Sequence, residues 1–308
     1  MHRTLTTRAA GIATTFGLAV ALAAPVHAVD NLTRCDDDCT SDCKLVEDLK
    51  CCSAVFCSGN GPINISSGVY LNMNGFDIEC LCGKKLCSIT ATECLADSDC
   101  PGSETCVDSG CTTCSYAAVQ MDGGSSAVKN TASTDSTIRG NFGMGVDCQS
   151  TSSSQVMGIG IKISGSGNVV GINNCAKVKE NVVTYEGDGL GTFGIWTEGV
   201  ANSDYIRDNY LDKWVLGIFL YTDTGGSVDH NFVYLRDDST VGIGLPASVV
   251  SALEVERNII VGGEDQLMVW GNATSSIEGN VCDPGNDGCA ECIDDGYCDE
   301  PTAPFTLP

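Results

Sequence analysis

Charged residues that recur at a regular interval along the chain are the first candidates for chemistry. Asp208, His230 and Arg257 occupy the same place in successive repeats, and Arg207 and Asp229 directly precede two of them. Carboxylates beside a basic side chain can act as general acid and base in the cleavage of a sugar polymer. The other interpretation is a ladder of opposite charges on a solvated face, with Arg207 over Asp229 and Asp208 over His230. We prefer the ladder, because charged faces that contact only water are the commoner case, and we keep catalysis by these five residues as the alternative.

Each of these charges lies inside a repeated phrase that would have to position it. The phrase consists of a β-branched residue, two variable residues and an asparagine. It begins at Ile138, Val178, Ile206, Val228, Val255 and Ile277, and it ends at Asn141, Asn181, Asn209, Asn231, Asn258 and Asn280. The last five asparagines follow one another at similar intervals, and Gly-Ile pairs fall between them. An interval of this length predicts a solenoid of short β-strands.

A single coil of such a repeat cannot bury its apolar residues, so the coils must stack. Stacking at about 4.8 Å pairs every strand with its neighbours and builds one continuous core. We therefore expect the isoleucine or valine of each phrase to be buried. We also expect the six asparagines to lie on one edge as a ladder of hydrogen-bonded amides, since asparagine tolerates the left-handed backbone of tight turns.

Aromatic residues supply the strongest indication of a binding surface. If Ile195 and Ile218 point inward, the alternation of a strand sends Trp196 and Phe219 outward in adjacent coils. The residues that follow the ladder asparagines form a second apolar column of Val182, Tyr210, Phe232, Ile259 and Val281. We interpret Trp196, Phe219, Tyr210 and Phe232 as a platform for sugar rings or for another protein. The alternative is that a loop or the terminal tail covers these side chains.

The segment 1–28 has the composition of a secretory signal peptide. Arg3 and Arg8 precede an apolar run that ends at a small-residue cleavage site, and the run is too short to span a membrane. The sequence therefore predicts a secreted or cell-surface protein without a transmembrane segment. The chain contains 16 Lys and Arg against 40 Asp and Glu, a formal net charge of −24. This charge excludes nucleic acid as a partner. We predict no cofactor, and calcium is the one ion that the many carboxylates would suit.

The 20 cysteines predict disulfides instead of a metal site. They are concentrated in the segments 29–115 and 282–308, and clustered cysteines of an exported protein are typically oxidised. Cys148 and Cys175 are separated by about one coil of the repeat, so they could bridge adjacent coils. His230 is the only histidine after the signal peptide, which excludes a metal site built on two histidines.

The repeat resembles the right-handed parallel β-helix proteins of the broad pectin-lyase-like superfamily. The resemblance covers about residues 63–281 and is strongest over 176–281. "SSGVYLNMNGFDI" (66–78) is similar to the opening coil of that family, and "ECLADSDCPGSETCVDSGCTTC" (93–114) resembles the cysteine-rich inserts of secreted bacterial proteins. The resemblance implies the fold. It implies little about function, because the superfamily contains lyases, hydrolases, epimerases and proteins without known activity.

We therefore predict an all-β protein, a right-handed parallel β-helix. Its parts would be a signal peptide (1–28), a cysteine-rich segment (29–62), a first coil (63–79), a cysteine-rich insert (80–115), the main β-helix (116–281) and a cysteine-rich C-terminal cap (282–308). The expected function is non-catalytic binding of a polysaccharide or a surface protein along one outward face, by a monomer. The alternative is a polysaccharide lyase or glycoside hydrolase of the same superfamily. A purely structural fibre would need exposed ends where the cysteine clusters predict caps.

Overall fold

A computed structural model of the chain defines the fold over most of the predicted β-helix. It describes residues 29–51, 62–88, 90, 93–108, 117–122, 124–149, 153–165, 167–198, 204–221, 226–235, 241–245, 253–262, 265–269 and 276–282. The predicted signal peptide, and the predicted C-terminal cap beyond residue 282, lie outside the described residues. Within the described part, no helix is long and apolar enough to cross a membrane.

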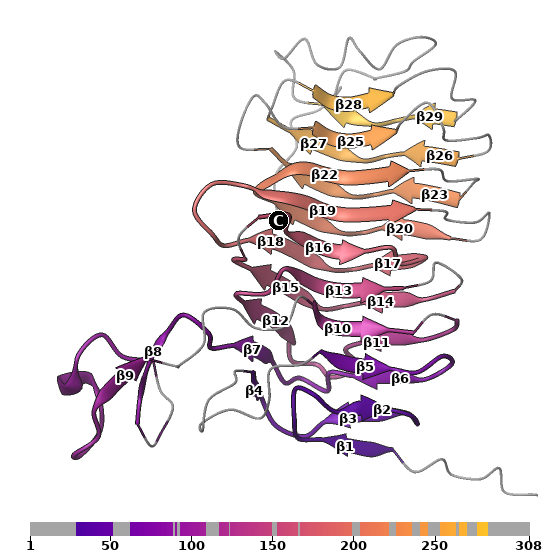
Figure 1. The fold of residues 1–308 in the computed structure, drawn as a ribbon. Coiled ribbons are helices and arrows are strands. Elements are labelled where there is room, and N and C mark those ends of the chain that lie inside the picture. Colours follow the sequence, from indigo (N-terminus) through magenta and orange to yellow (C-terminus); the bar gives the residue numbers. More distant parts are fainter. Residues whose placement is uncertain are drawn as a thin grey trace, which may run out of the picture.

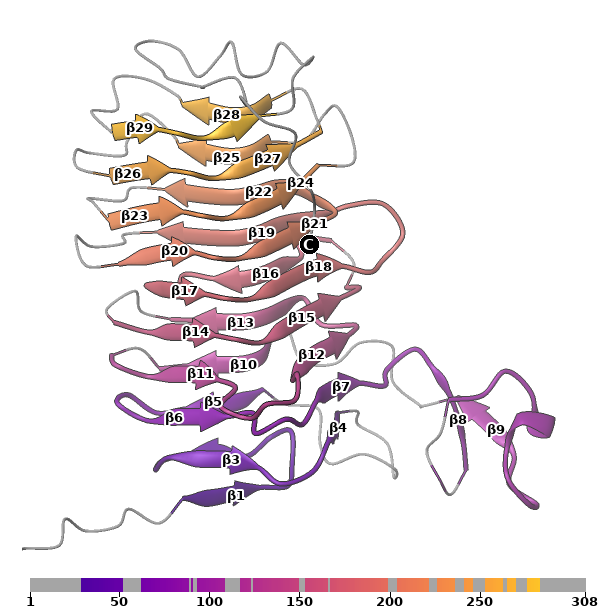
Figure 2. The same ribbon diagram turned by 180° about the vertical axis from the view of Figure 1, so that it is seen from behind.

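The described chain winds into a parallel β-solenoid with three sheets (Figures 1 and 2). Sheet A contains β1 (Asp30–Leu32), β3 (Cys43–Leu45), β6 (Tyr70–Asn72), β11 (Ala127–Lys129), β14 (Gln155–Met157), β17 (Lys177–Lys179), β20 (Tyr205–Arg207), β23 (Gly226–Asp229), β26 (Leu253–Glu256) and β29 (Ser276–Glu278). Sheet B contains β2 (Asp38–Cys39), β5 (Ile63–Ile65), β10 (Ala117–Met121), β13 (Met144–Cys148), β16 (Val170–Asn173), β19 (Gly191–Glu198), β22 (Trp214–Tyr221), β25 (Val241–Leu245) and β28 (Asp265–Val269). Sheet C contains β4 (Leu49–Cys51), β7 (Ile78–Cys80), β12 (Thr137–Gly140), β15 (Gly160–Ile163), β18 (Val182–Tyr185), β21 (Tyr210–Asp212), β24 (Phe232–Tyr234), β27 (Ile259–Val261) and β30 (Val281–Cys282).

Each coil of the main solenoid adds one strand to sheet B, then to sheet A, then to sheet C, as β16, β17 and β18 do. Strands of successive coils pair in parallel, so equivalent residues lie above one another as columns. The phrase valines and isoleucines that lie in sheet A, Val178, Ile206, Val228 and Val255, are buried, as the sequence predicts. The predicted parallel all-β solenoid is therefore confirmed.

The recurrent Gly-Ile pairs of sheet B have a steric cause. Ile195 and Ile218 point into the core with no exposed surface, and the glycine before each of them also faces inward. A Cβ atom on Gly217 would lie 2.5 Å from Cγ1 of Val233 and 2.6 Å from the carbonyl oxygen of Gly242. Gly145, Gly171 and Gly194 are confined in the same way. Only a hydrogen atom fits between sheet C and the next coil, so glycine recurs once a coil.

One of the six predicted phrases is out of phase with the others. Ile138 lies in β12 of sheet C, where it pairs with Ile78 and Ile161, whereas the other five phrases lie in sheet A. The prediction that Asn141 belongs to the asparagine ladder is therefore wrong. In the coil before Asn181 the ladder position is occupied by Ile159, after a glycine. The interval between Asn141 and Asn181 corresponds to two whole coils only if the coil of Asn141 has the same phase as the later ones. It does not, because Ile138 lies in sheet C.

The cysteine-rich insert forms a small unit beside the solenoid (Figures 1 and 2). It contains the antiparallel hairpin of β8 (Lys85–Cys87) and β9 (Cys106–Asp108) and the 3-10 turn η1 (Asp97–Asp99). Lys84 links it to β7, because its Nζ atom lies 3.1 Å from Glu79 and 3.0 Å from Glu93. Burial opposes the charge of Lys84, but the hydrogen bonds to these two carboxylates raise its pKa above the ordinary value.

Five disulfides are defined among the described residues. Four lie in the N-terminal region and the insert: Cys35–Cys51, Cys39–Cys43, Cys87–Cys100 and Cys94–Cys106. The fifth, Cys148–Cys175, joins β13 to the residues after β16 across a Cα–Cα distance of 5.1 Å. The predicted bridge between adjacent coils is confirmed, and it joins the coil of β13 to the coil that contains Asn181, the first residue of the asparagine ladder.

Reduction of the disulfides is expected to loosen the N-terminal region before the coils that follow Asn181. Four of the five defined bridges precede residue 107, whereas the coils from β17 to β27 depend on stacking and side-chain hydrogen bonds. Hydrogen exchange with and without reductant measures this difference. Protection should fall first over residues 29–51 and 80–108. An equal loss of protection along the whole solenoid would contradict the expectation.

Candidate functional site

The corner between sheets A and C is built by a turn that repeats in every coil from β17 onward. The residue after each sheet A strand has a left-handed backbone: φ is 58° at Glu180, 56° at Asp208, 55° at His230 and 52° at Arg257. Glycine takes the same position at Gly158 and Gly279, with φ of 66° and 62°. A left-handed conformation costs a residue with a side chain about 1–2 kcal/mol, so other contacts must hold these turns.

The asparagine ladder supplies those contacts. The Oδ1 atom of Asn209 accepts hydrogen bonds from the backbone N–H and the side-chain amide of Asn181, at 3.1 and 3.0 Å. The side-chain amide of Asn209 donates to the carbonyl oxygen of Val178 at 3.0 Å and to Oδ1 of Asn231 at 2.9 Å. Asn231 and Asn258 repeat the pattern, which ends at Asn280. All five amides are buried, so the ladder is confirmed for five of the six predicted residues.

The left-handed turn changes the partners of the predicted charge ladder. It places the side chains of consecutive residues on the same side, so ion pairs form within a coil. Nε of Arg207 lies 4.0 Å from Oδ2 of Asp208, and Nδ1 of His230 lies 3.0 Å from Oδ2 of Asp229. Lys179–Glu180 and Glu256–Arg257 repeat this arrangement at 2.7 and 3.7 Å. The predicted pairs of Arg207 with Asp229 and Asp208 with His230 are neighbours in register, but the ion pairs join different partners.

The five predicted catalytic residues do lie together at this corner. Asp208, His230 and Arg257 form the turn column, and Arg207 and Asp229 lie next to it at the end of sheet A. The side chains of the turn column are open to water, with exposed fractions of 44% for Asp208, 48% for His230 and 64% for Arg257, whereas Asp229 is 21% exposed. A salt-bridged row of this kind can hold the turns and attract charged groups.

Among the described residues, the outer face of sheet B carries two columns of outward side chains, and Ala117, Met144, Val170 and Val241 of the first column are buried. Its first outward column, aligned by the strand register, consists of Ala117, Met144, Val170, Phe193, Leu216 and Val241. Its second column contains Gln120, Asp147, Asn173, Trp196, Phe219 and Gly244. We call these two columns the sheet B face. One column is apolar over six strands, and the other changes from polar to aromatic at Trp196.

Trp196 and Phe219 are paired in register on this face, as the sequence predicts. Sequence reasoning missed Phe193, because Gly194 and Ile195 both face inward and interrupt the alternation of the strand. The ring centroids of Phe193 and Trp196 are 5.4 Å apart and nearly parallel, and Phe193 lies 5.7 Å from Phe219. The three rings therefore form one cluster. Nε1 of Trp196 is shielded and has no hydrogen-bond acceptor among the described residues.

Tyr210 and Phe232 lie on a different face from Trp196. They belong to an outward column of sheet C, Val182, Tyr210, Phe232, Ile259 and Val281, which the register confirms. The two rings stack at 5.4 Å with an angle of 9° between their planes, so they present edges, not faces, to the solvent. The four predicted platform residues therefore lie as two separate pairs on two different sheets.

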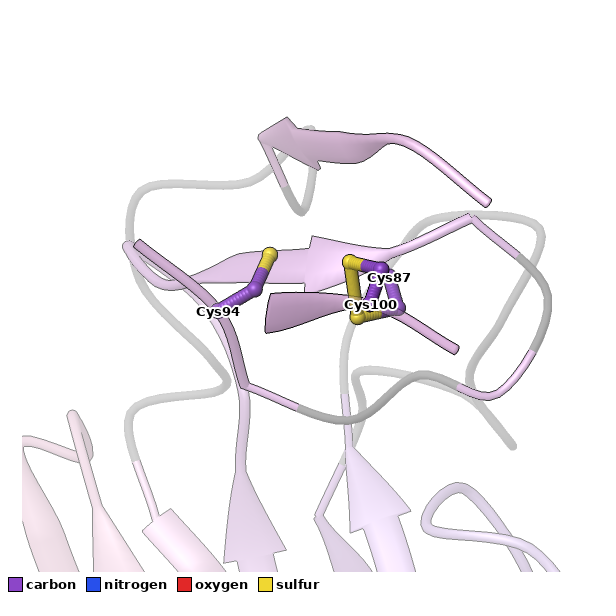
Figure 3. A group of neighbouring side chains, drawn as sticks. All are labelled: Cys87, Cys94 and Cys100. Atoms are coloured by element: carbon purple, nitrogen blue, oxygen red, sulfur yellow. A yellow bond between two sulfur atoms is a disulfide. The ribbon is translucent and has the colours of Figure 1, made fainter. Parts of the chain in front are cut away.

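Three buried cysteines of the insert have sulfur atoms close enough to hold a metal ion (Figure 3). The Sγ atoms of Cys87, Cys94 and Cys100 lie within 4.8 Å of one another. Cys87 is bonded to Cys100, and Cys94 to Cys106. Since a thiolate is the form that binds metal, these sulfur atoms are structural disulfides in the oxidised protein. The cluster therefore stabilises the insert, and sequence reasoning had also favoured disulfides in this segment.

The fold defines this chain as an all-β parallel solenoid with disulfide-bonded cysteines in its N-terminal region. No family model, curated protein or solved structure matches the chain. The pectin-lyase-like superfamily thus remains a resemblance in the sequence pattern, and function has to be argued from the surfaces of the solenoid.

Proposed function

We propose that this protein is exported and binds a glycan along the sheet B face without cleaving it. The single observation that carries the proposal is the cluster of Phe193, Trp196 and Phe219 at the end of a polar column. Aromatic rings supply large contact areas to the apolar faces of sugars, and amides and carboxylates supply hydrogen bonds to hydroxyl groups. The two kinds of group lie in one line along the solenoid axis.

The polar part of the line is already ordered for such contacts. The side-chain amide of Asn173 donates a hydrogen bond of 2.7 Å to Oδ1 of Asp147, which fixes both groups at the surface. Neighbouring coils are about 4.8 Å apart, so an extended polymer along the axis would meet one outward group after another.

Export agrees with the chemistry of the chain. The signal-like segment 1–28 and the clustered cysteines of the sequence are typical of exported proteins, and disulfides persist in oxidising compartments. A net charge of −24 favours a neutral or basic ligand over a strongly anionic polymer.

Replacing Trp196 by alanine is expected to weaken glycan binding at least ~30-fold, or about 2 kcal/mol, because buried aromatic residues dominate binding energies. The measurement is binding of the purified, oxidised protein to a panel of neutral and acidic polysaccharides, with detection of reducing and unsaturated ends in the same samples. Tyr210→Ala is the matched control, since it removes an aromatic ring from sheet C and should leave binding unchanged.

His230→Ala separates the binding proposal from the enzyme alternative. Binding should persist in this variant, and no new sugar ends should form with either protein. If the wild type releases sugar ends and His230→Ala abolishes them while Trp196→Ala does not, the protein is a lyase or hydrolase that uses the corner residues. A wild type that binds no polysaccharide but captures a protein through Trp196 would contradict the glycan proposal.

A further inference from the structure

The outer face of sheet A carries its charges in an antisymmetric pattern. Lys177 and Lys179 lie on β17 and Arg207 on β20, whereas Asp229 lies on β23 and two acids on β26. The register aligns these residues into a first column of Lys177, Tyr205, Ser227 and Glu254 and a second column of Lys179, Arg207, Asp229 and Glu256. Over these four strands both columns run from cations on β17 to anions on β26, and the register continues the second column to Glu278 on β29.

The column of turn residues beside sheet A also changes the sign of its charge between β20 and β23, but in the opposite order. Glu180 and Asp208 carry negative charges beside β17 and β20, and His230 and Arg257 follow beside β23 and β26. These side chains reach solvent: the exposed fraction is 57% for Glu180 and 64% for Arg257. We call the three columns over these four coils the charged face. Along the solenoid axis, the sign of the charge changes within each of the three columns between β17 and β26.

We propose that two copies of this chain associate through their charged faces in antiparallel orientation. A two-fold axis parallel to the strands, between β20 and β23, places each column over the same column of the second copy with the coil order reversed. Lys179 then faces Glu256 of the second copy, and Arg207 faces Asp229. In the same arrangement Lys177 faces Glu254, Glu180 faces Arg257, and Asp208 faces His230. Every charge of the three columns over these four coils meets an opposite charge or an imidazole.

The parallel arrangement does not share this complementarity. A two-fold axis along the solenoid keeps the coil order and exchanges the columns of sheet A. It sets Lys177 against Lys179 and Glu254 against Glu256 of the second copy, and like charges in contact cost several kcal/mol. An anionic polymer is also disfavoured, because Glu180 and Asp208 flank the cations at 2.7 and 4.0 Å. A second copy offers both signs in the required order.

The association should be weak and governed by charge. Each exposed ion pair contributes about 0–1 kcal/mol, and the net charges of two chains repel each other. Complementary charges fix orientation and specificity more than affinity. This inference replaces the monomer that the sequence predicts, and it does not depend on the glycan proposal for sheet B.

Sedimentation equilibrium of two charge-reversal variants at about 0.15 M salt, where exposed charges are screened beyond about 8 Å, tests the proposal. The variant Lys179→Glu, Arg207→Glu makes the charged face acidic, and Asp229→Lys, Glu256→Lys makes it basic. Each alone should associate at least ~10-fold more weakly than the wild type, because its own copies now oppose like charges. An equimolar mixture should form heterodimers with an affinity within ~3-fold of the wild type.

Recovery in the mixture separates lost association from lost folding, since a misfolded variant would not recover it. The proposal is overturned if the folded wild type stays monomeric at the highest concentration reached. It is equally overturned if a wild-type dimer tolerates both reversals unchanged. Heparin serves as an anionic polymer probe: if it binds the wild-type monomer and the acidic variant loses that binding, the face is an anion-binding surface instead of a self-association surface.

Discussion

Asn209→Ala is expected to lower the free energy of unfolding by about 3 kcal/mol, because it leaves several buried polar groups without partners. The substitution removes the acceptor of two buried donors of Asn181, the backbone N–H at 3.1 Å and the side-chain amide at 3.0 Å. It also leaves the carbonyl oxygen of Val178 without the amide that binds it at 3.0 Å. A buried polar group that loses its partner costs about 1–3 kcal/mol. Denaturant unfolding followed by circular dichroism, with an unchanged slope against denaturant, measures the loss.

Two other asparagines provide the controls for this prediction. Asn280→Ala removes the last member of the ladder, whose side-chain amide donates to the carbonyl oxygen of Val255, and it should cost somewhat less. Asn173→Ala removes an outward amide with a hydrogen bond to Asp147 and should cost under about 1 kcal/mol, the usual net value of a solvated hydrogen bond. An equal loss of unfolding free energy in Asn209→Ala and Asn173→Ala would show that the buried ladder stabilises the protein no more than a solvated hydrogen bond does.

Gly217→Ala is expected to destabilise the solenoid by about 2–3 kcal/mol, although it adds a single methyl group. The new Cβ atom would lie 2.5 Å from Cγ1 of Val233 in sheet C and 2.6 Å from the carbonyl oxygen of Gly242 in the next coil. Neither neighbour can retreat without moving a strand, and forced overpacking of a core typically costs about 1–3 kcal/mol. Thermal or chemical unfolding detects the change.

Ala118 provides the matched control for the glycine column. It is the buried residue that precedes Val119 in β10, as Gly217 precedes Ile218 in β22. At this position β10 already accommodates a Cβ atom. Ala118→Gly should therefore lower the free energy of unfolding by only about 1 kcal/mol, because glycine gives the unfolded chain more backbone freedom. If Gly217→Ala is neutral or stabilising, the steric explanation for the repeated Gly-Ile pairs is wrong.

The period of the sequence was sufficient to predict the stacking of coils. The spacing of the asparagines predicted the ladder from Asn181 to Asn280, and one coil of separation predicted the Cys148–Cys175 bridge. Burial of one β-branched residue per strand placed Trp196 over Phe219. These features depend on how often a residue type recurs, which the sequence displays directly.

The errors arose where the backbone departs from a regular strand. The left-handed turn brings Arg207 and Asp208 to the same side, so the ion pairs differ from those of a flat sheet. The inward Gly194 breaks the two-residue alternation and turns Phe193 outward. Asn141 ends a matching phrase but does not occupy a matching position, because the strand of its phrase belongs to sheet C. Such departures depend on dihedral angles and steric contacts that residue spacing does not reveal.

The corner that holds the asparagine ladder also determines where the chain can vary in length. From β14 onward, every connection from sheet A to sheet C has the same short length, as between β20 (Tyr205–Arg207) and β21 (Tyr210–Asp212). From sheet B to sheet A the length changes from coil to coil, since β19 ends at Glu198 and β20 begins at Tyr205, whereas β22 ends at Tyr221 and β23 begins at Gly226. From sheet C to sheet B the length varies as well, since β21 ends at Asp212 and β22 begins at Trp214, whereas β24 ends at Tyr234 and β25 begins at Val241. One corner acts as a fixed spine, and insertions accumulate at the other two. The solenoid can therefore acquire new loops along two edges while the register of all three sheets stays unchanged.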